Sequence, residues 1–278
     1  MRGNKILRGE EMLRRRIRNW LIYLIRPIWY LFWNSFPEGA AKDLVRDLWI
    51  KFANSAPNEV VIRRGDTVIL VGAPSGGEYL RMAKLVGEDG HVIVIEPEKR
   101  NIEELNREID EKSLRNKVTV VPKGAYSERG KQILKVSPHP EDHKIEIEGI
   151  EHDNDLRPEN YQSIQEIYVD TLDNILRELG VDKVDFIKIT VNGAEIEVLK
   201  GMGETLDRVS RLWIKGHAKL RGQPINRIIV SMLRDRGFNA KIIGGGDAPI
   251  SKDFVRTGDV YAYKKPFSYR WRRGACKK

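Results

Sequence analysis

The sequence contains a single cysteine, Cys276, among its 278 residues. One cysteine excludes an intramolecular disulfide bond, and it excludes a metal cluster that is built from several thiolates. This scarcity is typical of a protein in a reducing compartment. We therefore expect a cytoplasmic protein.

The sequence also lacks a long apolar run without charge. Residues 17–36, IRNWLIYLIRPIWYLFWNSF, come nearest to one, but Arg26 and Pro27 interrupt the run at its middle. A charge is costly at the centre of a bilayer, and proline kinks a helix. Aromatic residues beside arginines favour the membrane–water interface. We predict that residues 14–36 form a kinked helix at the inner face of a membrane; packing against the protein body or a second subunit, and a true span, are the alternatives.

Acidic residues are scarce at both ends of a chain whose net charge is +9. Residues 1–18 hold seven arginines and lysines against two glutamates, and residues 264–278 hold seven and no acid, so the part between them is slightly acidic. The tail interleaves these cations with Phe267, Tyr269 and Trp271, a combination that can contact anionic lipid or nucleic acid. No base-reading motif is present, so nucleic acid is a secondary alternative, beside a solvated tail.

Between the two ends, strand-like and helix-like segments alternate. This order predicts an α/β fold with a mostly parallel, doubly wound sheet, in which ligands bind beyond the carboxyl ends of the strands. Residues 130–165 are polar and are expected to form hairpins or loops. Strands are predicted over 68–71, 91–97, 117–122, 184–190, 211–217, 239–245 and 259–265, and helices over 38–57, 78–86, 99–112, 171–179, 194–200 and 224–236.

Three parts follow from these patterns. Residues 1–57 form a basic, aromatic-rich helical extension at the amino end, residues 58–265 form the α/β domain, and residues 266–278 form a basic tail. No internal repeat is visible. The oligomeric state stays open.

A glycine-rich loop follows the first predicted strand, in TVILVGAPSGGEY (67–79). The loop lacks the G-x-G-x-x-G pattern that cradles a dinucleotide pyrophosphate. Glu96 closes the next strand, where a carboxylate can accept hydrogen bonds from the hydroxyls of a ribose. A nucleoside without a diphosphate, such as S-adenosyl-L-methionine, fits this pair of features. An ordinary turn followed by a surface glutamate is the alternative.

Five segments continue this pattern in order: VGAPSGGEY, GHVIVIEPEKRNIEELNREI, VTVVPKGAYSERG, VDTLDNIL and VDFIKITVNGAEIEVLKGM. Over residues 66–203 they resemble the FkbM-type family of S-adenosylmethionine-dependent methyltransferases, and the last segment is the most distinctive. The resemblance implies a class I, Rossmann-like methyltransferase sheet and methylation of a hydroxyl on a sugar, glycan or natural product. It also implies a cofactor site at Gly72, Ala73, Gly76, Gly77, Glu96, Pro97 and Ala125.

The sequence departs from the family at several acidic or polar positions. Val71 stands where an Asp is usual, and Pro74 replaces an Asn. The family's KIDVEGAE reads KITVNGAE here, so that Thr190 and Asn192 replace two acids, and Lys215 replaces an acid shortly before a histidine. These losses support an alternative class of function: a catalytically degenerate domain that serves as a binding or interaction module.

Methyl transfer from a sulfonium depends mainly on alignment, and a base can add about two to four powers of ten in rate. His217, at the end of a predicted strand, is the candidate base, with a structural histidine as the alternative. Thr190 and Asn192 are candidates for orienting the acceptor hydroxyl. Glu195 is expected to begin a helix, where an acid is favourable.

Three further histidines, His139, His143 and His152, lie in an acidic stretch. We interpret them as solvated loop residues and predict no metal site, although their spacing makes one conceivable. The leading hypothesis is therefore a methyltransferase that uses S-adenosylmethionine on a glycan, a lipid-linked sugar or another small hydroxyl acceptor. A degenerate interaction module and an RNA-associated methyltransferase remain the alternatives.

Overall fold

The computed structural model describes residues 61–73, 77–140, 142–152, 161–216, 218–243 and 258–264. The predicted extension and tail lie outside these ranges, and so do Gly76 and His217. Within the described ranges, no helix is long and apolar enough to cross a membrane.

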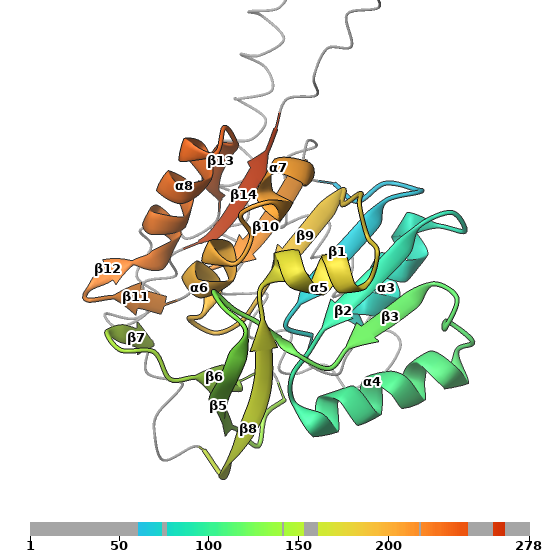
Figure 1. Cartoon of the computed structure of the whole chain (residues 1–278), viewed down its shortest axis with the longest axis horizontal. Coiled ribbons are helices and arrows are strands. Elements are labelled where there is room, and N and C mark those ends of the chain that lie inside the picture. Colours follow the sequence, from blue (N-terminus) through green and yellow to red (C-terminus); the bar gives the residue numbers. More distant parts are fainter. Residues whose placement is uncertain are drawn as a thin grey trace, which may run out of the picture. The chain divides into compact units, whose positions relative to one another are not determined.

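The described residues build a seven-stranded main sheet (Figure 1) in the order β13-β14-β10-β9-β1-β2-β3. The strands from β10 to β3 run parallel, whereas β14 is antiparallel to both of its neighbours. The doubly wound, mostly parallel sheet that the sequence predicts is thereby confirmed. The strands are β1 (Thr67–Val71), β2 (His91–Ile95), β3 (Val118–Val121), β9 (Phe186–Ile189), β10 (Arg211–Lys215), β13 (Asn239–Ile243) and β14 (Asp259–Tyr263).

The central strand β1 consists of apolar residues because helices cover both faces of the sheet. Val68, Ile69 and Leu70 are fully buried. In register, Val71 lies beside Ile95 of β2 and Ile189 of β9. The carboxyl ends of these three strands therefore meet at one edge, where β1 separates the two halves of the sheet.

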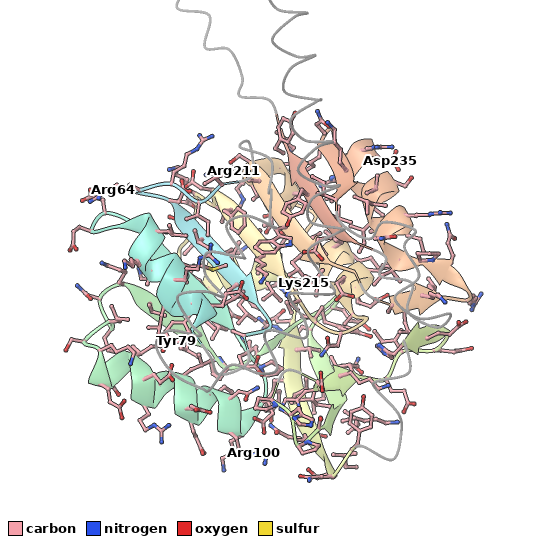
Figure 2. The ribbon with its side chains drawn as sticks, turned by 180° about the vertical axis from the view of Figure 1, so that it is seen from behind. Arg64, Tyr79, Arg100, Arg211, Lys215 and Asp235 are labelled. Carbon is pink, nitrogen blue, oxygen red and sulfur yellow. The ribbon has the colours of Figure 1, made fainter. Side chains whose placement is uncertain are left out.

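Helices α3 (Glu78–Val86) and α4 (Lys99–Glu111) pack on the face shown in Figure 2. In α3 the buried residues Tyr79, Met82, Ala83 and Val86 recur with helical spacing. Helix α4 begins where the carboxylate of Glu98 accepts a hydrogen bond from the backbone N–H of Asn101. The sequence predicts both helices to within one residue.

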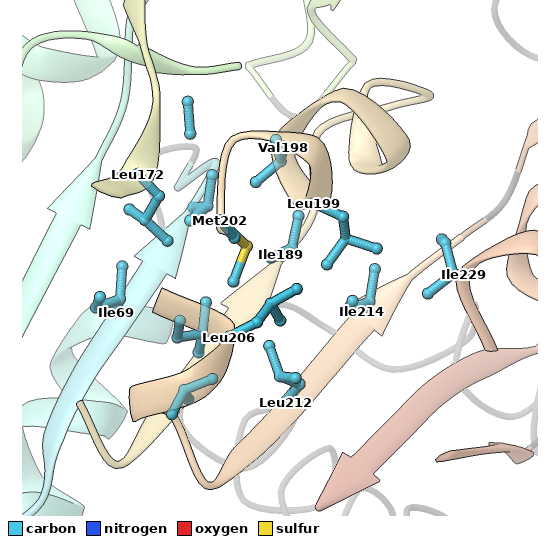
Figure 3. Packing of buried hydrophobic residues seen from close by; sticks show 14 of the residues in the cluster. Ile69, Leu172, Ile189, Val198, Leu199, Met202, Leu206, Leu212, Ile214 and Ile229 are labelled. Carbon is cyan, nitrogen blue, oxygen red and sulfur yellow. The ribbon is translucent and has the colours of Figure 1, made fainter. Parts of the chain in front are cut away.

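The opposite face carries α5 (Leu172–Glu178), α6 (Glu195–Lys200), α7 (Thr205–Arg208) and α8 (Ile225–Asp235). Their apolar side chains form one aliphatic cluster with the strands (Figure 3). Deleting one of its buried leucine or isoleucine side chains to alanine should cost about 2–5 kcal/mol. The cluster includes Ile69, Leu172, Ile189, Val198, Leu199, Met202, Leu206, Leu212 and Ile214.

A second, four-stranded sheet stands beside the main sheet, in the lower part of Figure 1. Its long strands are β5 (Gly130–Val136) and β8 (Ser163–Asp170), with β4 (Gly124–Ala125) and β6 (Lys144–Ile145) at the edges. The sequence prediction of hairpins or loops over 130–165 missed β8. One face of that strand is exposed and still carries Ile164 and Tyr168, so its apolar residues lie on both faces and give no clear alternation.

A third, three-stranded sheet joins β7 (Ile150–His152), β11 (Ala218–Leu220) and β12 (Gln223–Pro224). Strand β11 begins three residues after β10 ends, which is where the predicted strand 211–217 was drawn too long. The antiparallel pairing of β7 with β11 brings the segment that follows β6 back to the carboxyl end of the main sheet.

Candidate active site

The loop after β1 begins between β2 and β9, and backbone hydrogen bonds join this region to both. The Gly72 N–H donates to the carbonyl of Ile95 (2.9 Å), and the Thr190 N–H donates to the carbonyl of Val71 (2.9 Å). Gly72 has φ +76°, and a Cβ added there would lie 2.0 Å from the carbonyl oxygen of Thr190. Glycine is required at this position by the chain's own backbone rather than by a ligand.

Gly77 is a different kind of glycine. It precedes α3 with φ +74°, and an added Cβ would meet nothing within 4 Å. Gly77 has no side chain with which to cap α3, and the first N–H groups of a helix can bind an anionic group. Gly77 therefore has room for a side chain, which Gly72 does not have.

Glu96 follows β2, and its side chain is buried. Its Oε2 accepts a hydrogen bond from Ala73 N (3.0 Å), while Oε1 accepts from Glu98 N (3.0 Å) and Asn101 Nδ2 (3.4 Å). Burial raises the pKa of this carboxyl to about 7, although these hydrogen bonds act in the opposite direction. The carboxylate holds the glycine loop against β2, and Oε2 retains capacity for one further donor.

Pro97 and Ala125 continue this edge toward β3. Ala125 is buried and pairs with Asp170 of β8. A Cβ added to the neighbouring Gly124 would lie 3.8 Å from the Cβ of Pro97. The structure therefore brings the predicted cofactor residues Ala73, Glu96, Pro97 and Ala125 together along the ends of β1, β2 and β3.

On the other side of β1, the loop after β9 presents Thr190. Its Oγ1 atom is buried and has no hydrogen-bond partner among the described residues. A hydroxyl in that state is unfavourable unless a ligand completes its hydrogen bonding. The backbone carbonyl of Thr190 lies against Gly72, so this residue is next to the glycine loop.

The rest of that loop is held by Glu195 and by Asn192. Glu195 begins α6 as predicted, and its carboxylate accepts hydrogen bonds from Val191 N (3.3 Å) and Gly193 N (3.0 Å). Burial raises the pKa of Glu195 to about 7. Asn192 has φ +48° and donates from Nδ2 to the carbonyl of His143 (2.9 Å). Its amide nitrogen therefore bonds to the segment that follows β5.

The interpretation of three solvated histidines is correct for His139, which is exposed, and wrong for the other two. The His143 side chain is only 8% exposed, and its Nδ1 accepts a hydrogen bond from Ser137 N (3.0 Å). Burial lowers the pKa of His143, and it lowers the pKa of His152 to about 4. Sequence reasoning missed both residues because their partners lie far along the chain: the carbonyl of His143 bonds to Asn192, and His152 pairs with Ala218. Among the described residues, no group of three or more His, Cys, Asp and Glu could hold a metal ion.

The residues at this edge fit a nucleoside that carries an amino-acid group. The free capacity of Glu96 suits a ribose hydroxyl, the open end of α3 suits a carboxylate, and the unpartnered Thr190 hydroxyl suits a polar group between them. Thr190 and Asn192, which stand where the family has acids, are still polar residues.

Comparison with known proteins gives matches of very different extent. A 74-residue stretch, 26% of this chain, is 34% identical to the AMB antimetabolite synthetase AmbE of Pseudomonas aeruginosa, of which it spans only 4%. A methyltransferase FkbM structure from Methylobacillus flagellatus is 15% identical, with a TM-score of 0.47 over 87% of this chain and 60% of that one. Aeropyrum pernix fibrillarin, solved with natively bound S-adenosyl-L-methionine, is 13% identical, with a TM-score of 0.48 over 78% of this chain and 74% of that one.

A match to a family model adds to these individual likenesses. The family model of the methyltransferase FkbM domain matches residues 71–240, from the last residue of β1 into β13. This range is more than half of the chain, and it contains the glycine loop, Glu96 and the loop after β9. S-Adenosylmethionine is accordingly the cofactor, and the chain belongs to the FkbM methyltransferase family.

Proposed function

We propose that the protein transfers the methyl group of S-adenosylmethionine to a hydroxyl group of a glycan, a lipid-linked sugar or another small acceptor. One observation carries this proposal. Three groups with capacity for a ligand converge beside β1: the Glu96 carboxylate, the open amino end of α3 and the unpartnered Thr190 hydroxyl. An interaction module without a ligand would leave the Thr190 hydroxyl buried without compensation.

The roles of the residues follow from their places. Glu96 would bind the ribose through Oε2, with Pro97 and Ala125 beside the adenine. Gly72, Ala73, Gly76 and Gly77 would form the wall at the amino-acid end. When bound, the cofactor supplies an activated methyl group on a sulfonium, whose departure as a neutral thioether needs no acid. The protein's main contribution is then to align the acceptor oxygen with that group and to exclude water.

The acceptor hydroxyl must also lose a proton. We keep His217, Thr190 and Asn192 as proposed acceptor-side residues, with His217 as a candidate base and the other two as hydrogen-bonding partners. His217 lies outside the described residues. Thr190 reaches this edge directly, whereas Asn192 already donates from Nδ2 to His143.

The proposal also includes the domain bounds and the membrane contact that the sequence predicts. Residues 1–57 would be a helical extension whose segment 14–36 contacts the inner face of a membrane, and residues 266–278 would be a basic tail on the domain 58–265. Deleting residues 1–36 should then abolish co-sedimentation with anionic liposomes while the protein still binds its cofactor. Co-sedimentation that survives the deletion would contradict this part.

The first test is calorimetric titration with S-adenosylhomocysteine. The wild-type protein should bind it in the micromolar range, and Glu96→Gln should weaken binding about tenfold or more, because an amide cannot accept from all the donors around it. Glu103→Gln, an exposed residue of α4, serves as the matched control and should change nothing. Absence of heat in the wild type would overturn the proposal in favour of a non-catalytic module.

The second test concerns the acceptor. Methyl-tritiated S-adenosylmethionine can be incubated with simple methyl glycosides, lipid-linked sugars and polyols. The proposal predicts labelled products that resist alkali, because an ether of a hydroxyl is stable where a carboxyl ester is not. Label found only in alkali-labile esters or in added RNA would contradict methylation of these hydroxyls.

A further inference from the structure

His152 occupies an unexpected place for a residue of a polar insertion. It is the last residue of β7, and it pairs with Ala218 of β11. Strand β11 follows β10 after two residues, at the carboxyl edge of the main sheet. The pairing therefore delivers His152 to the side of the edge that lies beyond β9 and β10.

At that edge the imidazole fills the space of a missing side chain. A Cβ added to Gly193 would lie 2.8 Å from His152 Cε1 and 3.3 Å from His152 Nε2. Gly193 has φ +100°, a conformation that residues with side chains rarely adopt. A glycine at 193 thus allows the ring of His152 to lie directly against the loop after β9.

Hydrogen bonds hold this loop, residues 190–194, in place. Glu195 holds it from within through the N–H groups of Val191 and Gly193, and Asn192 bonds to the carbonyl of His143. Three residues before Gly193, the backbone carbonyl of Thr190 lies against Gly72 of the glycine loop, and the buried Thr190 hydroxyl has no hydrogen-bond partner among the described residues. In a doubly wound sheet the ligand lies where the two halves diverge, here between β1 and β9. With Glu96 marking the ribose end, the reacting end of the cofactor belongs on the β9 side.

The imidazole of His152 can accept a hydrogen bond. Among the described residues, none forms a hydrogen bond with its nitrogens. Burial, and secondarily the charge of Lys144, lower the pKa of His152 to about 4, so the imidazole is neutral near pH 7. A neutral imidazole has one nitrogen that accepts a hydrogen bond.

We propose that His152 is a catalytic residue on the acceptor side, whose Nε2 accepts the hydrogen bond of the reacting hydroxyl. As the acceptor oxygen forms its bond to the methyl carbon and the carbon–sulfur bond breaks, the hydroxyl proton passes to Nε2. The sulfonium loses its positive charge and the imidazole gains one, so the total charge is unchanged. The assignment rests on the proposed function and adds a second histidine to the candidate His217.

A pair of cofactor analogues can test whether His152 lies beside the methyl position, and this test needs no known acceptor. S-Adenosylhomocysteine has no group at the methyl position, whereas sinefungin carries an ammonium there. A neutral imidazole beside that position accepts a hydrogen bond from the ammonium and should make sinefungin the tighter ligand. His152→Phe should reduce the preference for sinefungin about tenfold, and it should leave the affinity for S-adenosylhomocysteine within about twofold. His152→Gln, which keeps an acceptor atom, should retain part of the preference.

Two control variants separate the possible outcomes. His139→Phe changes an exposed histidine of the same insertion and should leave both affinities unchanged. If His217→Phe removes the preference and His152→Phe does not, the assignment of His152 is wrong. If the wild type binds neither analogue, the proposed function itself fails and this assignment fails with it.

A measurement on the wild-type protein guards against a variant that does not fold. In protein labelled with ¹³C-histidine, the His152 signal, identified by its absence in His152→Gln, should move more with sinefungin than with S-adenosylhomocysteine. The His139 signal should not move. Equal responses of the His152 signal to the two ligands would overturn the proposal.

Discussion

The loop after β1 and the loop after β9 lie side by side at one edge of the sheet, and a buried glutamate holds each of them. Glu96 reaches the first loop from the neighbouring strand, and its carboxylate joins the loop to β2 and to the start of α4. Glu195 belongs to the segment that it holds, since it accepts N–H groups two and four residues before it. Burial raises the pKa of both carboxyls to about 7.

The two glutamates therefore differ in what they connect: Glu96 joins separate elements, whereas Glu195 stabilises a single loop. Glu96 can exchange part of its bonding for a ligand, because among the described residues Oε2 accepts only the Ala73 N–H. Both oxygens of Glu195 are directed at the backbone of its own loop, where they shape the wall that Thr190 and Gly193 form. We infer that the first loop serves binding, whereas the second fixes the geometry of transfer.

The largest effect is expected when one methyl group is added where the two loops touch. Gly72→Ala should lower the free energy of unfolding by about 3 kcal/mol or more, since a strained φ and a clash with the Thr190 carbonyl add together. Gly77→Ala has nearly the same φ and open space, and it should cost only about 1 kcal/mol. Urea unfolding of both variants checks this prediction. Equal losses would mean that the loops do not meet as described.

The next effect is on the pH dependence of stability. A carboxyl whose pKa rises from 4.5 to about 7 on folding keeps a proton that the unfolded chain releases, so its contribution to stability falls as the pH rises through that window. Glu195→Gln removes this loss. The free energy of unfolding of the variant, minus that of the wild type, should therefore increase between about pH 5 and pH 7, approaching 1.4 kcal/mol per pH unit.

Glu96→Gln should change the pH dependence in the same direction, because burial raises the pKa of that carboxyl too. The difference between variant and wild type is the quantity to measure, because His143 and His152, whose pKa values are lowered, act with the opposite sign in both proteins. Glu103→Gln, at an exposed position, is the control with a flat difference. A flat difference for Glu195→Gln would show that its carboxyl is ionised without penalty.

The sequence predicted the surroundings of Glu96 better than the surroundings of His152. Apolar runs placed β1 and β2, and a glutamate at a strand end followed by a helix signal marked the edge where Ala73 and Glu96 meet. These features are local in the chain, so periodicity and turn chemistry reveal them. The sequence did not show that Gly72 is needed for contact with Thr190, because 118 residues separate the two positions.

The position of His152 depends on contacts between distant segments, which no local sequence pattern predicts. His152 reaches Gly193 only because β7 pairs with β11, and a histidine in an acidic stretch gives no sign of that pairing. Strand β8 was missed because one of its faces is exposed, with Ile164 and Tyr168 on that face. Burial of the histidines is therefore a property of the assembled sheets rather than of the segment.

The smallest effect distinguishes a hydroxyl kept for a ligand from one used by the fold. Thr190→Val removes a buried hydroxyl without a partner, so the ligand-free protein should become more stable by about 1 kcal/mol. Thr205→Val removes a buried hydroxyl that donates to Asp173 (2.6 Å), and it should instead cost about 1–2 kcal/mol. If the Thr190 hydroxyl completes its bonding with the cofactor, the same Thr190→Val change should weaken S-adenosylhomocysteine several-fold, whereas Thr205→Val should not. Unchanged affinity for Thr190→Val, measured by calorimetry, would assign that hydroxyl to the acceptor and leave the cofactor to Glu96 and the glycine loop.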